Sequence, residues 1–323
     1  LMDRKLLRSQ LKHTLESTHF QNQGELYTGK VRDNYIREDD TIMMITTDRI
    51  SAFDRVLGTI PFKGQCLVSL ADWWFGETAD IIANHVKSRP HPNVWEVRKC
   101  DPIPVEMVVR GYLTGVTSTS AWSAYEKGDR NFCGNKLPDG MVKNQPFDEP
   151  IITPSTKAKQ GEHDESVSPD ELFKREIIDP DLYELLANYS MRLYNRGVER
   201  AAEKGMIFVD TKYEFGIYNG KIMLMDEVNT PDSSRYWMAD SYQSRFEQGK
   251  EPIKLDKEFL REWLANQGFL GEGEQPKLTD KIRMDVADKY ITLAETFIGE
   301  PLKLDIGSTF ESIKSVVDPF DTF

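Results

Sequence analysis

The sequence predicts an α+β protein made of two lobes that share a cleft. The chain has 323 residues, more than one hydrophobic core usually organises. Period-two hairpin patterns and helices with recognisable ends occur along its length. The segment at 101–104 contains two prolines and forms a stiff, extended connector. We therefore expect one lobe over residues 1–104 and a second over residues 105–323.

In the first lobe the expected elements are a helix, a hairpin, a second helix and a strand. Leucines at four-residue spacing among basic residues predict an amphipathic surface helix within residues 1–15. A strand over residues 25–37, a polar turn and a returning strand over residues 41–46 predict a hairpin. Helical apolar spacing follows over residues 67–86, and residues 93–100 alternate as a strand does.

The second lobe is expected to begin with a strand and to contain one long helix. Residues 105–110 are mostly apolar, as in a strand buried on both faces. Residues 128–164 show little periodicity and predict a long functional loop. The best-defined helix has Asp179 as its cap, Pro180 at its first position and Gly205 after its end. The remaining expected elements are strands at 207–215 and 221–228 around the Asn219-Gly220 turn, and helices at 256–266 and 279–298.

The composition excludes several classes of protein. Acidic residues outnumber basic ones by 53 to 41, so the surface repels nucleic acids, and any polyanionic ligand must be small and held by local cations. No apolar run is long enough to span a bilayer, and residues 1–15 lack the continuous apolar segment of a secretory signal. Three cysteines without C-x-x-C spacing argue against disulfides and structural zinc. We expect a cytoplasmic protein that binds neither membranes nor nucleic acids.

The first candidate ligand site is the segment from Gly29 to Asp33. A glycine lets the backbone approach a ligand, and Lys30 and Arg32 alternate on one face of the expected strand. By itself this pattern is weak, because strand cations are more often solvated edge residues that discourage aggregation.

The second candidate is an acid-base-acid row. Period two places Asp210, Lys212 and Glu214 on one face of a strand. On the partner strand, Asp226 and Glu227 interrupt an apolar run. Two carboxylates from facing strands suit a magnesium ion that bridges ATP phosphates, because Mg²⁺ prefers hard oxygen ligands. The alternative is an exposed face with cross-strand ion pairs.

The register of this hairpin tests the shared metal. A two-residue Asn-Gly turn pairs Glu214 with Met225 and directs Asp226 to the opposite face. A metal shared by Glu214 and Asp226 therefore needs a one-residue slip, and we expect a bulge or a longer loop at Gly216. Glu214 directly across from Met225, with Asp226 turned away, would exclude the shared metal.

The third candidate set is cationic. Arg110 ends a buried strand where it opens into a loop, a common position for ligand contacts. Arg235 follows a turn, and Lys257 and Arg261 are one helical turn apart on one expected face. Pairing with surface carboxylates is the simpler explanation for the last two. The sequence contains no P-loop, nucleophile-elbow or dinucleotide-binding glycine motif, and its histidines lack metal-type spacing.

Seven segments, in order, resemble the SAICAR synthetase family, the phosphoribosylaminoimidazole-succinocarboxamide synthases of purine biosynthesis. They are YTGKVRD at 27–33, TDRISAFD at 47–54, VRGYLTG at 109–115, TPSTKA at 153–158, VDTKYEFG at 209–216, DEV at 226–228 and TPDSSRYW at 230–237. A chance occurrence of all of them in this order is implausible. The segment at 133–144 and the one around Lys157 resemble the longer variety of the family.

The resemblance implies two α/β lobes with ATP between them, the first similar to the nucleotide-binding lobe of kinases and ATP-grasp enzymes. It implies ATP-dependent condensation of 5-amino-1-(5-phosphoribosyl)imidazole-4-carboxylate (CAIR) with L-aspartate, which gives a succinocarboxamide (SAICAR), ADP and phosphate. A carboxylate is a poor acylating agent, and phosphoryl transfer to it creates an acyl phosphate that an amine attacks. Such chemistry needs a metal, cations and positioning rather than a protein nucleophile.

By position, the resemblance also implies a role for each candidate residue. The implied ATP-binding residues are Gly29, Lys30, Val31 and Arg32, and the implied Mg²⁺ ligands are Glu214 and Asp226. The residues implied to line the reacting carboxylate are Asp54, Asp210 and Lys212. Those implied to bind the ribonucleotide are Arg110, Arg235, Lys257 and Arg261, and the candidates for the aspartate pocket are Lys143, Ser155 and Lys157.

One position departs from the family pattern. Val116 stands where the family commonly has a serine, and it offers no hydroxyl to the ribonucleotide phosphate. Thr117 or Ser118 would supply one if the loop shifts. Two other functions stay open at this point: a small-molecule kinase that stops after phosphoryl transfer, and a nucleotide sensor without catalysis. The oligomeric state is also open, a monomer included.

Overall fold

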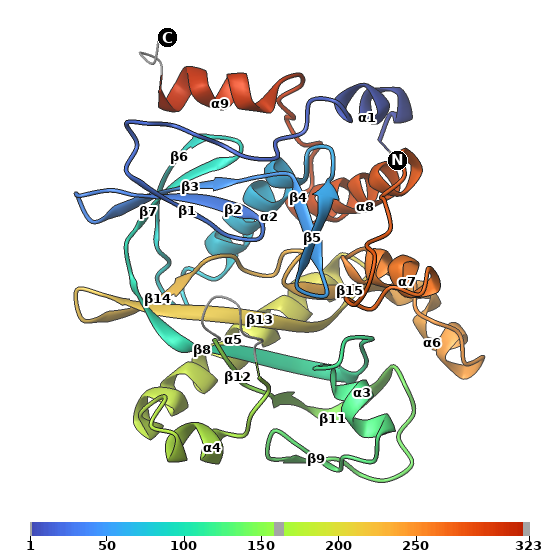
Figure 1. The fold of residues 1–323 in the computed structure, drawn as a ribbon. Helices are drawn as coiled ribbons and strands as arrows, with labels where there is room; N and C mark the ends of the chain where they lie inside the picture. The colour runs from blue at the N-terminus through green and yellow to red at the C-terminus, as the bar shows by residue number, and fades with distance from the viewer. Residues whose placement is uncertain (1, 158–164, 319–323) are drawn as a thin grey trace. The chain divides into compact units, whose positions relative to one another are not determined.

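The computed structural model of the chain describes residues 2–157 and 165–318, and the chain divides into two compact units (Figure 1). The first unit consists of Leu1–Trp74, His85–Lys99 and Phe259–Phe323, and the second of Phe75–Asn84 and Cys100–Glu258. The segment from Phe259 onward thus packs with the first unit, whereas the prediction assigned it to the second lobe. The division of functions predicted for residues 1–104 and 105–323 stays a prediction.

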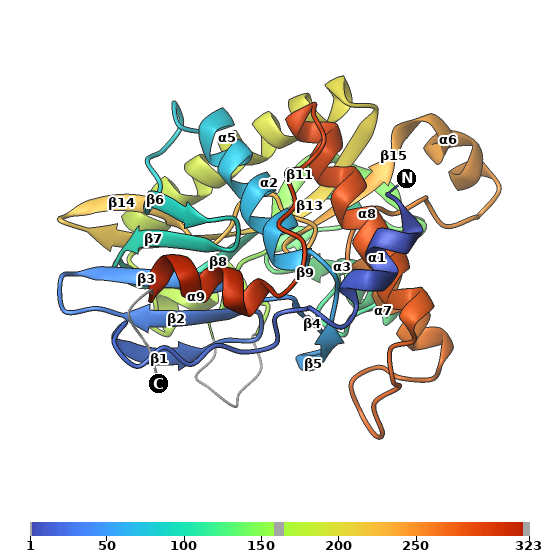
Figure 2. The ribbon, with the colours of Figure 1, turned by 90° about the horizontal axis from the view of Figure 1, so that it is seen from above.

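A five-stranded antiparallel sheet is the centre of the first unit. Its strands follow the order β1 (Glu25–Thr28), β2 (Arg32–Ile36), β3 (Thr41–Thr46), β7 (Val94–Arg98) and β6 (Val86–His91). Helix α9 (Thr309–Val317) packs against one face of this sheet (Figure 2). There Phe310 stacks on Phe20 with ring centroids 5.5 Å apart, and Ile313 is fully buried. A helix that the sequence patterns do not predict therefore completes this core.

The predicted strand over residues 25–37 is in fact two antiparallel strands. Thr28 pairs with Asp33, and the Gly29 N–H donates to the Arg32 carbonyl at 2.8 Å, so residues 29–31 form a tight loop. The prediction that Lys30 and Arg32 alternate on one strand is wrong, because Lys30 is on the loop and Arg32 on β2. Hydrogen bonds from residues 47 and 49 stabilise the loop, and periodicity within residues 25–37 does not reveal them.

A second core of the first unit lies between helices and a short ribbon. Its helices are α1 (Arg4–Gln10), α2 (Lys63–Glu77), α7 (Glu258–Asn266) and α8 (Asp280–Ile298), and the ribbon consists of β4 (Arg49–Ala52) and β5 (Arg55–Thr59). The last three residues of α2 and the first residue of α7 belong to the second unit. Leu7, Leu67 and Tyr290 are each at most 1% exposed. The four predicted helices of these regions exist, but the first and second are shorter at their C-terminal ends. Val86, the predicted last residue of the second helix, is instead the first residue of β6.

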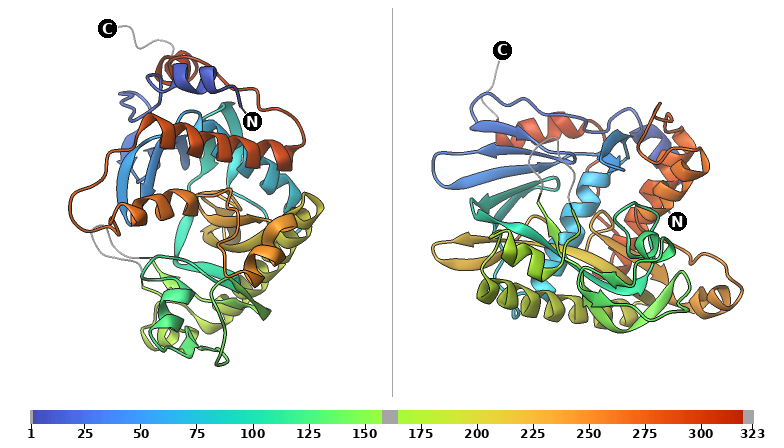
Figure 3. Two further views of the ribbon diagram at one scale, coloured as in Figure 1. Left: turned by 90° about the vertical axis from the view of Figure 1, so that its right-hand side faces the viewer. Right: turned by 60° about the horizontal axis from the view of Figure 1, so that its bottom comes forward.

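The second unit is built on a six-stranded sheet. Four strands follow the order β11 (Gln145–Ile152), β8 (Asp101–Leu113), β13 (Met206–Tyr218) and β14 (Lys221–Met225), while β12 (Ser155–Thr156) also pairs with β8 and β15 (Ser234–Met238) with β13. Helix α5 (Pro180–Glu203) lies along β13 and β8 (Figure 3). As predicted, Asp179 caps α5, Pro180 opens it, and Gly205 follows its end with a φ of +71°. The Tyr194 hydroxyl donates to the Phe208 carbonyl at 3.0 Å, which joins this helix to the sheet.

Several segments of the second unit are more ordered than predicted. The shorter elements are α3 (Ala121–Glu126), β9 (Asn131–Phe132), β10 (Asn135–Lys136), α4 (Pro169–Lys174) and α6 (Ala239–Glu247). The predicted loop at 128–164 thus contains four strands, and its residues 158–164 lie outside the described residues. The predicted connector at 101–104 is the first part of β8, because the extended geometry that prolines impose is also that of a strand. No described helix is long and apolar enough to cross a membrane.

Candidate active site

Three neighbouring strands of the second unit carry charged side chains on one face of the sheet. Glu106 pairs with Glu214, and Arg110 pairs with Asp210, across β8 and β13. Asp210 also pairs with Arg235 across β13 and β15. Directly paired residues share a face, and so do residues two apart on a strand. The row predicted from residue 210 to residue 214 therefore forms as expected, and the arginines extend it.

At one end of the row, two buried carboxylates and two partly exposed ammonium groups form a network. Lys212 Nζ lies 2.8 Å from Oε1 of both Glu106 and Glu214, and Lys157 Nζ lies 2.5 Å from Oε2 of Glu214. Burial alone would raise the pKa of Glu214, but Lys212 and Lys157 lower it well below its usual range. Burial likewise acts to lower the pKa of Lys212, but Glu214, Glu106 and Asp226 raise it well above its usual range. Glu214 and Lys212 are therefore both ionised at neutral pH.

The hairpin of β13 and β14 lacks the predicted slip. Glu214 is directly across from Met225, and the pairing is regular up to the turn at 219–220. The predicted bulge at Gly216 is therefore absent from this hairpin, and the register shift found there belongs to the pairing of β13 with β8. A Cβ on Gly216 would lie 2.7 Å from the Met225 sulfur, so close packing explains the glycine instead.

Asp226 nevertheless belongs to the lysine network. It follows the last paired residue of β14 and has a left-handed backbone with a φ of 66°, so strand alternation no longer fixes its side-chain direction. Its carboxylate interacts favourably with the ammonium groups of Lys157 and Lys212, which both bind Glu214. One half of the condition against a shared metal, the register, is met. Because Asp226 acts electrostatically on the two lysines that bind Glu214, the shared metal stays a prediction. A left-handed residue at the end of the strand replaces the predicted slip.

At the other end of the row, Asp210 binds two buried arginines. Its Oδ2 lies 2.7 Å from Arg235 Nη1 and 3.8 Å from Arg110 Nη1. Arg110 Nε donates to the Thr153 hydroxyl at 2.8 Å, and Arg235 Nε donates to Glu258 at 3.3 Å. Burial lowers the pKa of Arg110, whereas for Arg235 the opposing effect of Asp210 and Glu258 exceeds that of burial and raises the pKa. Asp210 thus holds two guanidinium groups side by side.

Two of the residues predicted for the aspartate pocket lie in different surroundings. Ser155 pairs with Glu106 across β12 and β8, which places it beside the lysine network. Lys143 Nζ lies 2.6 Å from one oxygen of Glu251, whose other oxygen binds Lys254 at 2.8 Å. The lysine pair on Glu251 therefore forms a second cluster, and Lys143 is not in the network around residue 214.

The predicted hydroxyl donors are in the loop after β8. Thr117 is half-buried and Ser118 is exposed, and the Thr117 carbonyl accepts from the Ser120 N–H at 3.1 Å. A Cβ on Gly115 would lie 3.0 Å from Arg235 Nη2, so the start of this loop touches the arginine cluster.

The prediction that Lys257 and Arg261 lie on one helix face is wrong. Helix α7 begins at Glu258, whose N–H donates to Asp256 at 2.7 Å, so Lys257 lies before the helix in a turn. Lys257 Nζ is 4.0 Å from Asp232, within the second unit, whereas Arg261 belongs to the first.

In the first unit, Lys30 and Asp54 form an ion pair at 2.5 Å. Asp54 is in the turn between β4 and β5, where Phe53 and Asp54 have φ values of +50° and +60°. Such a backbone is uncommon for a bulky residue and marks a position that its surroundings enforce. The side chains of Lys30 and Asp54 are 54% and 52% exposed, so a ligand can reach both, while Arg32 is buried on β2.

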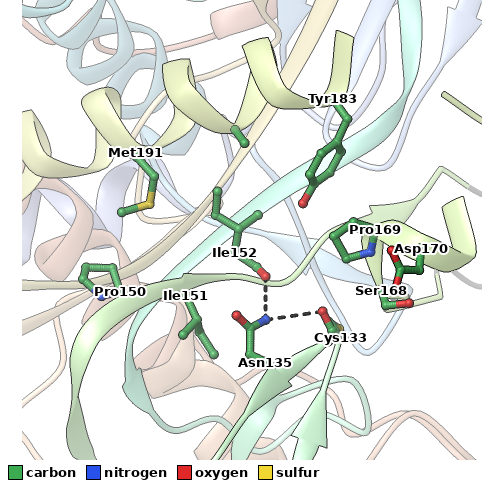
Figure 4. A pocket seen from close by; sticks show the side chains of 12 residues that line it. Cys133, Asn135, Pro150, Ile151, Ile152, Ser168, Pro169, Asp170, Tyr183 and Met191 are labelled. Carbon is green, nitrogen blue, oxygen red and sulfur yellow. Dashed lines mark hydrogen bonds between the residues drawn. The ribbon is translucent and has the colours of Figure 1, made fainter. Parts of the chain in front are cut away.

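A cavity of about 500 Å³ in the second unit contains none of the predicted site residues (Figure 4). Its lining includes Asn135, Ile152 and, from α5, Tyr183 and Met191. The Asn135 amide donates to the Ile152 carbonyl at 2.8 Å. Asp170 is the one charged side chain among the described residues that line this cavity. Without a cation it is no site for a phosphate, and the charged sheet face remains the candidate.

Three residues that contact the predicted residues of the charged sheet face were missed by the sequence reasoning: Glu106, Thr153 and Glu258. Glu106 had a detectable pattern, since a carboxylate inside an otherwise apolar strand must have a partner or a function. Thr153 and Glu258 had none, because each meets its arginine only through the fold.

Comparisons with known proteins agree with this geometry. A model of the SAICAR synthetase family matches residues 25–276. The phosphoribosylaminoimidazole-succinocarboxamide synthase of Bacteroides thetaiotaomicron is 48% identical over 306 residues, which are 94% of this chain and 96% of that protein. The chloroplastic enzyme of Vigna aconitifolia is 54% identical over 74% of this chain and 69% of that one. Among solved structures, SAICAR synthase from Saccharomyces cerevisiae complexed with SAICAR has a TM-score of 0.77 and 34% identity, over 90% of this chain and 100% of that one.

The α+β fold and its clusters of cations and carboxylates are suited to an enzyme that acts on small charged metabolites. The extent of these matches identifies it more narrowly: the chain belongs to the SAICAR synthetase family. It is an ATP-dependent carbon–nitrogen ligase of de novo purine biosynthesis, which condenses CAIR with L-aspartate to SAICAR, ADP and phosphate.

Proposed function

We propose that the charged sheet face of the second unit binds the metal and the ribonucleotide, and that residues 29–32 bind ATP phosphates. The observation that carries the proposal is the cross-strand row. Residues from separate segments of the sequence become neighbours on one face: Arg110, Asp210, Lys212, Glu214 and Arg235. Burying ionised groups costs free energy even when they are paired, so a role in stability alone does not account for them.

Glu214 and Asp226 fit a magnesium site. Mg²⁺ is commonly bound by one or two carboxylates together with phosphate oxygens. The described part of the chain has no group of three or more His, Cys, Asp or Glu suited to a metal, so a two-carboxylate site completed by phosphate is the form that fits. The two lysines on Glu214 support the fit, because they show that positive charge is favoured at both oxygens. A bound Mg²⁺ would neutralise charge on the phosphoryl group as it is transferred.

Arg110 and Arg235 are proposed to bind the phosphate of the ribonucleotide. A guanidinium presents its donors as a planar fork that matches phosphate oxygens, and it remains charged when buried. Asp210 orients both groups. Lys257 and the hydroxyls of Thr117 and Ser118 are proposed to complete this contact, and Arg261 is proposed for the same ligand on the strength of the family pattern.

The reacting groups are proposed to meet the lysine network. Lys212 would offset the charge of the CAIR carboxylate while an oxygen of that carboxylate attacks the γ-phosphorus of ATP and ADP leaves. Asp54 is proposed to line the same carboxylate on the strength of the family pattern. The amine of aspartate would then attack the carbonyl carbon of the acyl phosphate, and phosphate would leave. Ser155, Lys157 and Lys143 are proposed for aspartate. Orientation and charge supply the catalysis, and no side-chain nucleophile is required.

The test is a reaction of the purified protein with ATP, Mg²⁺, aspartate and CAIR. We expect SAICAR by mass and ADP in equal amount, with no sustained ADP release beyond one turnover when aspartate is omitted. ADP release that proceeds equally well without aspartate would favour a small-molecule kinase instead. For the site itself, Arg235→Lys should raise the KM for CAIR and leave the KM for ATP unchanged. Equal effects on both would contradict the phosphate role of the arginine pair.

We also propose that the protein works in the cytoplasm. The three cysteines are free and buried, as is typical of a reducing compartment. The oligomeric state stays open, and light scattering after gel filtration decides it, since a monomer has a mass of 37.2 kDa.

A further inference from the structure

We infer that Arg49 is a positioning residue for the loop at residues 29–31: it fixes the loop's carbonyl groups so that the loop's N–H groups face the ATP phosphates. This inference rests on the proposed phosphate role of that loop. Arg49 is 6% exposed and lies at the start of β4, outside every residue set predicted from the sequence.

The guanidinium of Arg49 donates most of its hydrogen bonds to backbone carbonyls. Its Nη2 donates to the Gly29 carbonyl at 3.0 Å, its Nε to the Lys30 carbonyl at 3.2 Å, and its Nη1 to the Glu16 carbonyl at 2.5 Å. A further bond from Nη2 reaches Asp33 Oδ1 at 2.8 Å. Four of the five N–H donors of the side chain are thus engaged inside the protein. Arg49 is therefore not itself placed to bind a phosphate.

The other partners hold the arginine in place. Asp33 is 1% exposed, and its second oxygen accepts from both the N–H and the hydroxyl of Thr18 at 2.8 Å. A buried ion pair whose groups make this many hydrogen bonds is rigid. Thr47 extends the support, since its N–H and its hydroxyl both donate to the Val31 carbonyl.

Three consecutive carbonyls of the loop thus point toward the segment at 47–49. In a trans peptide the C=O and the following N–H point in opposite directions. No cis peptide occurs in the part of the chain that the structure describes. The N–H groups of Lys30 and Val31 therefore point away from Arg49, on the side of the loop that is left for a ligand. Two successive N–H groups on the outer side of a turn are donors that an anion can use.

The test compares Arg49→Lys with Lys30→Met in the full-length protein, with the Kd of ADP and the Kd of adenosine as readouts. Lysine keeps the positive charge beside Asp33 but cannot reach the three carbonyls at once. We expect Arg49→Lys to weaken ADP about tenfold, which is the effect of one lost charge-assisted hydrogen bond. Adenosine has no phosphate, so its affinity should not change.

Arg283→Lys is the matched control. Arg283 also donates to backbone carbonyls in the first unit, those of Thr59 at 2.7 Å and Leu11 at 3.1 Å, but it does not touch the loop. We expect Arg283→Lys to lower thermal stability as Arg49→Lys does, with both nucleotide affinities unchanged. An equal loss of ADP affinity in the two variants would mean general destabilisation and would overturn the inference.

The outcomes separate this inference from the proposed function. ADP affinity lost in Lys30→Met but kept in Arg49→Lys overturns the role of Arg49 and leaves the phosphate loop intact. ADP affinity kept in both variants overturns the phosphate loop, and the inference with it. If Arg49→Lys does not fold, Thr47→Val decides the same question, because it removes the hydroxyl bond to Val31 at similar volume. A smaller selective loss of ADP is expected there, and no loss would overturn the inference.

Discussion

Replacing Glu214 by glutamine tests whether this carboxylate of the lysine network binds the metal or only stabilises the fold. The variant keeps the side-chain size and removes one negative charge. Lys212 retains Glu106 at 2.8 Å, and Lys157, with 40% of its side chain exposed, can be hydrated. The remaining network pairs two carboxylates, Glu106 and Asp226, with two lysines. We therefore expect a loss of about 1–3 kcal/mol in the free energy of unfolding, less than the roughly 3–5 kcal/mol of a stranded buried charge.

The effect on catalysis should be larger than the effect on stability. Because Glu214 is a proposed metal ligand, kcat/KM should fall at least about a hundredfold, which corresponds to about 2.7 kcal/mol. The Mg²⁺ concentration that gives half of the maximal rate should rise. Initial rates measured over a range of Mg²⁺ at fixed ATP give both quantities, and denaturant unfolding gives the stability.

Glu251→Gln is the matched control for this prediction. Glu251 also binds two lysines, at 2.6 and 2.8 Å, and they lower its pKa to about 2 against the opposing effect of burial. It lies in the other lysine cluster, so its replacement should lower stability without changing the Mg²⁺ dependence. The reasoning is refuted if Glu214→Gln keeps the wild-type Mg²⁺ dependence and a kcat/KM within a few-fold of wild type.

Three further predictions follow from the contacts of single residues. Asp210→Asn should raise the KM for CAIR about tenfold and leave the KM for ATP unchanged, because two guanidinium groups lose their shared carboxylate; a fall in kcat alone would instead indicate direct action on the reacting carboxylate. Burial raises the pKa of Asp48 in the folded chain to about 6, above its value in the unfolded chain. The protonated carboxyl therefore adds about 3 kcal/mol to the free energy of unfolding below about pH 4, and this contribution is lost as the pH rises to 6. Denaturant unfolding of Asp48→Asn should show a smaller decline over that range, and an unchanged decline would contradict the assignment. Gly64→Ala should destabilise by about 1–3 kcal/mol, because its Cβ would lie 2.3 Å from the Thr46 carbonyl oxygen; Gly76→Ala in the same helix meets nothing within 4 Å and should not destabilise.

Features whose cause is local were predictable from the sequence. Asp179 and Pro180 mark the start of α5 because a cap and a first-turn proline act on the neighbouring backbone alone. The turn at 219–220 formed with positive φ at both residues for the same reason. The polar row on β13 also depends only on strand alternation.

Features with a distant cause were predicted wrongly or not at all. The loop at 29–31 divides an expected strand because Arg49 and Thr47 bind its carbonyls. The carboxylate of Asp226 joins the network through a left-handed residue rather than a slip, and such a backbone depends on the packing around it. Helix α9 was also missed, although it has a local signal: Ser308 caps it and accepts from the Glu311 N–H. Its apolar residues gain their burial only on the face of the sheet made from residues 25–98.

The sequence by itself therefore determined the family, the reaction and most residues of the charged sheet face, since each depends on residue identity and short spacing. Tertiary structure alone decided which of these residues meet. It joined Glu106 to Lys212 across two strands, Asp210 to two arginines across three, and Arg49 to the loop at 29–31. The physical reason is that a buried charge pairs with a group within hydrogen-bonding distance. That distance is set by the fold and does not depend on separation along the sequence.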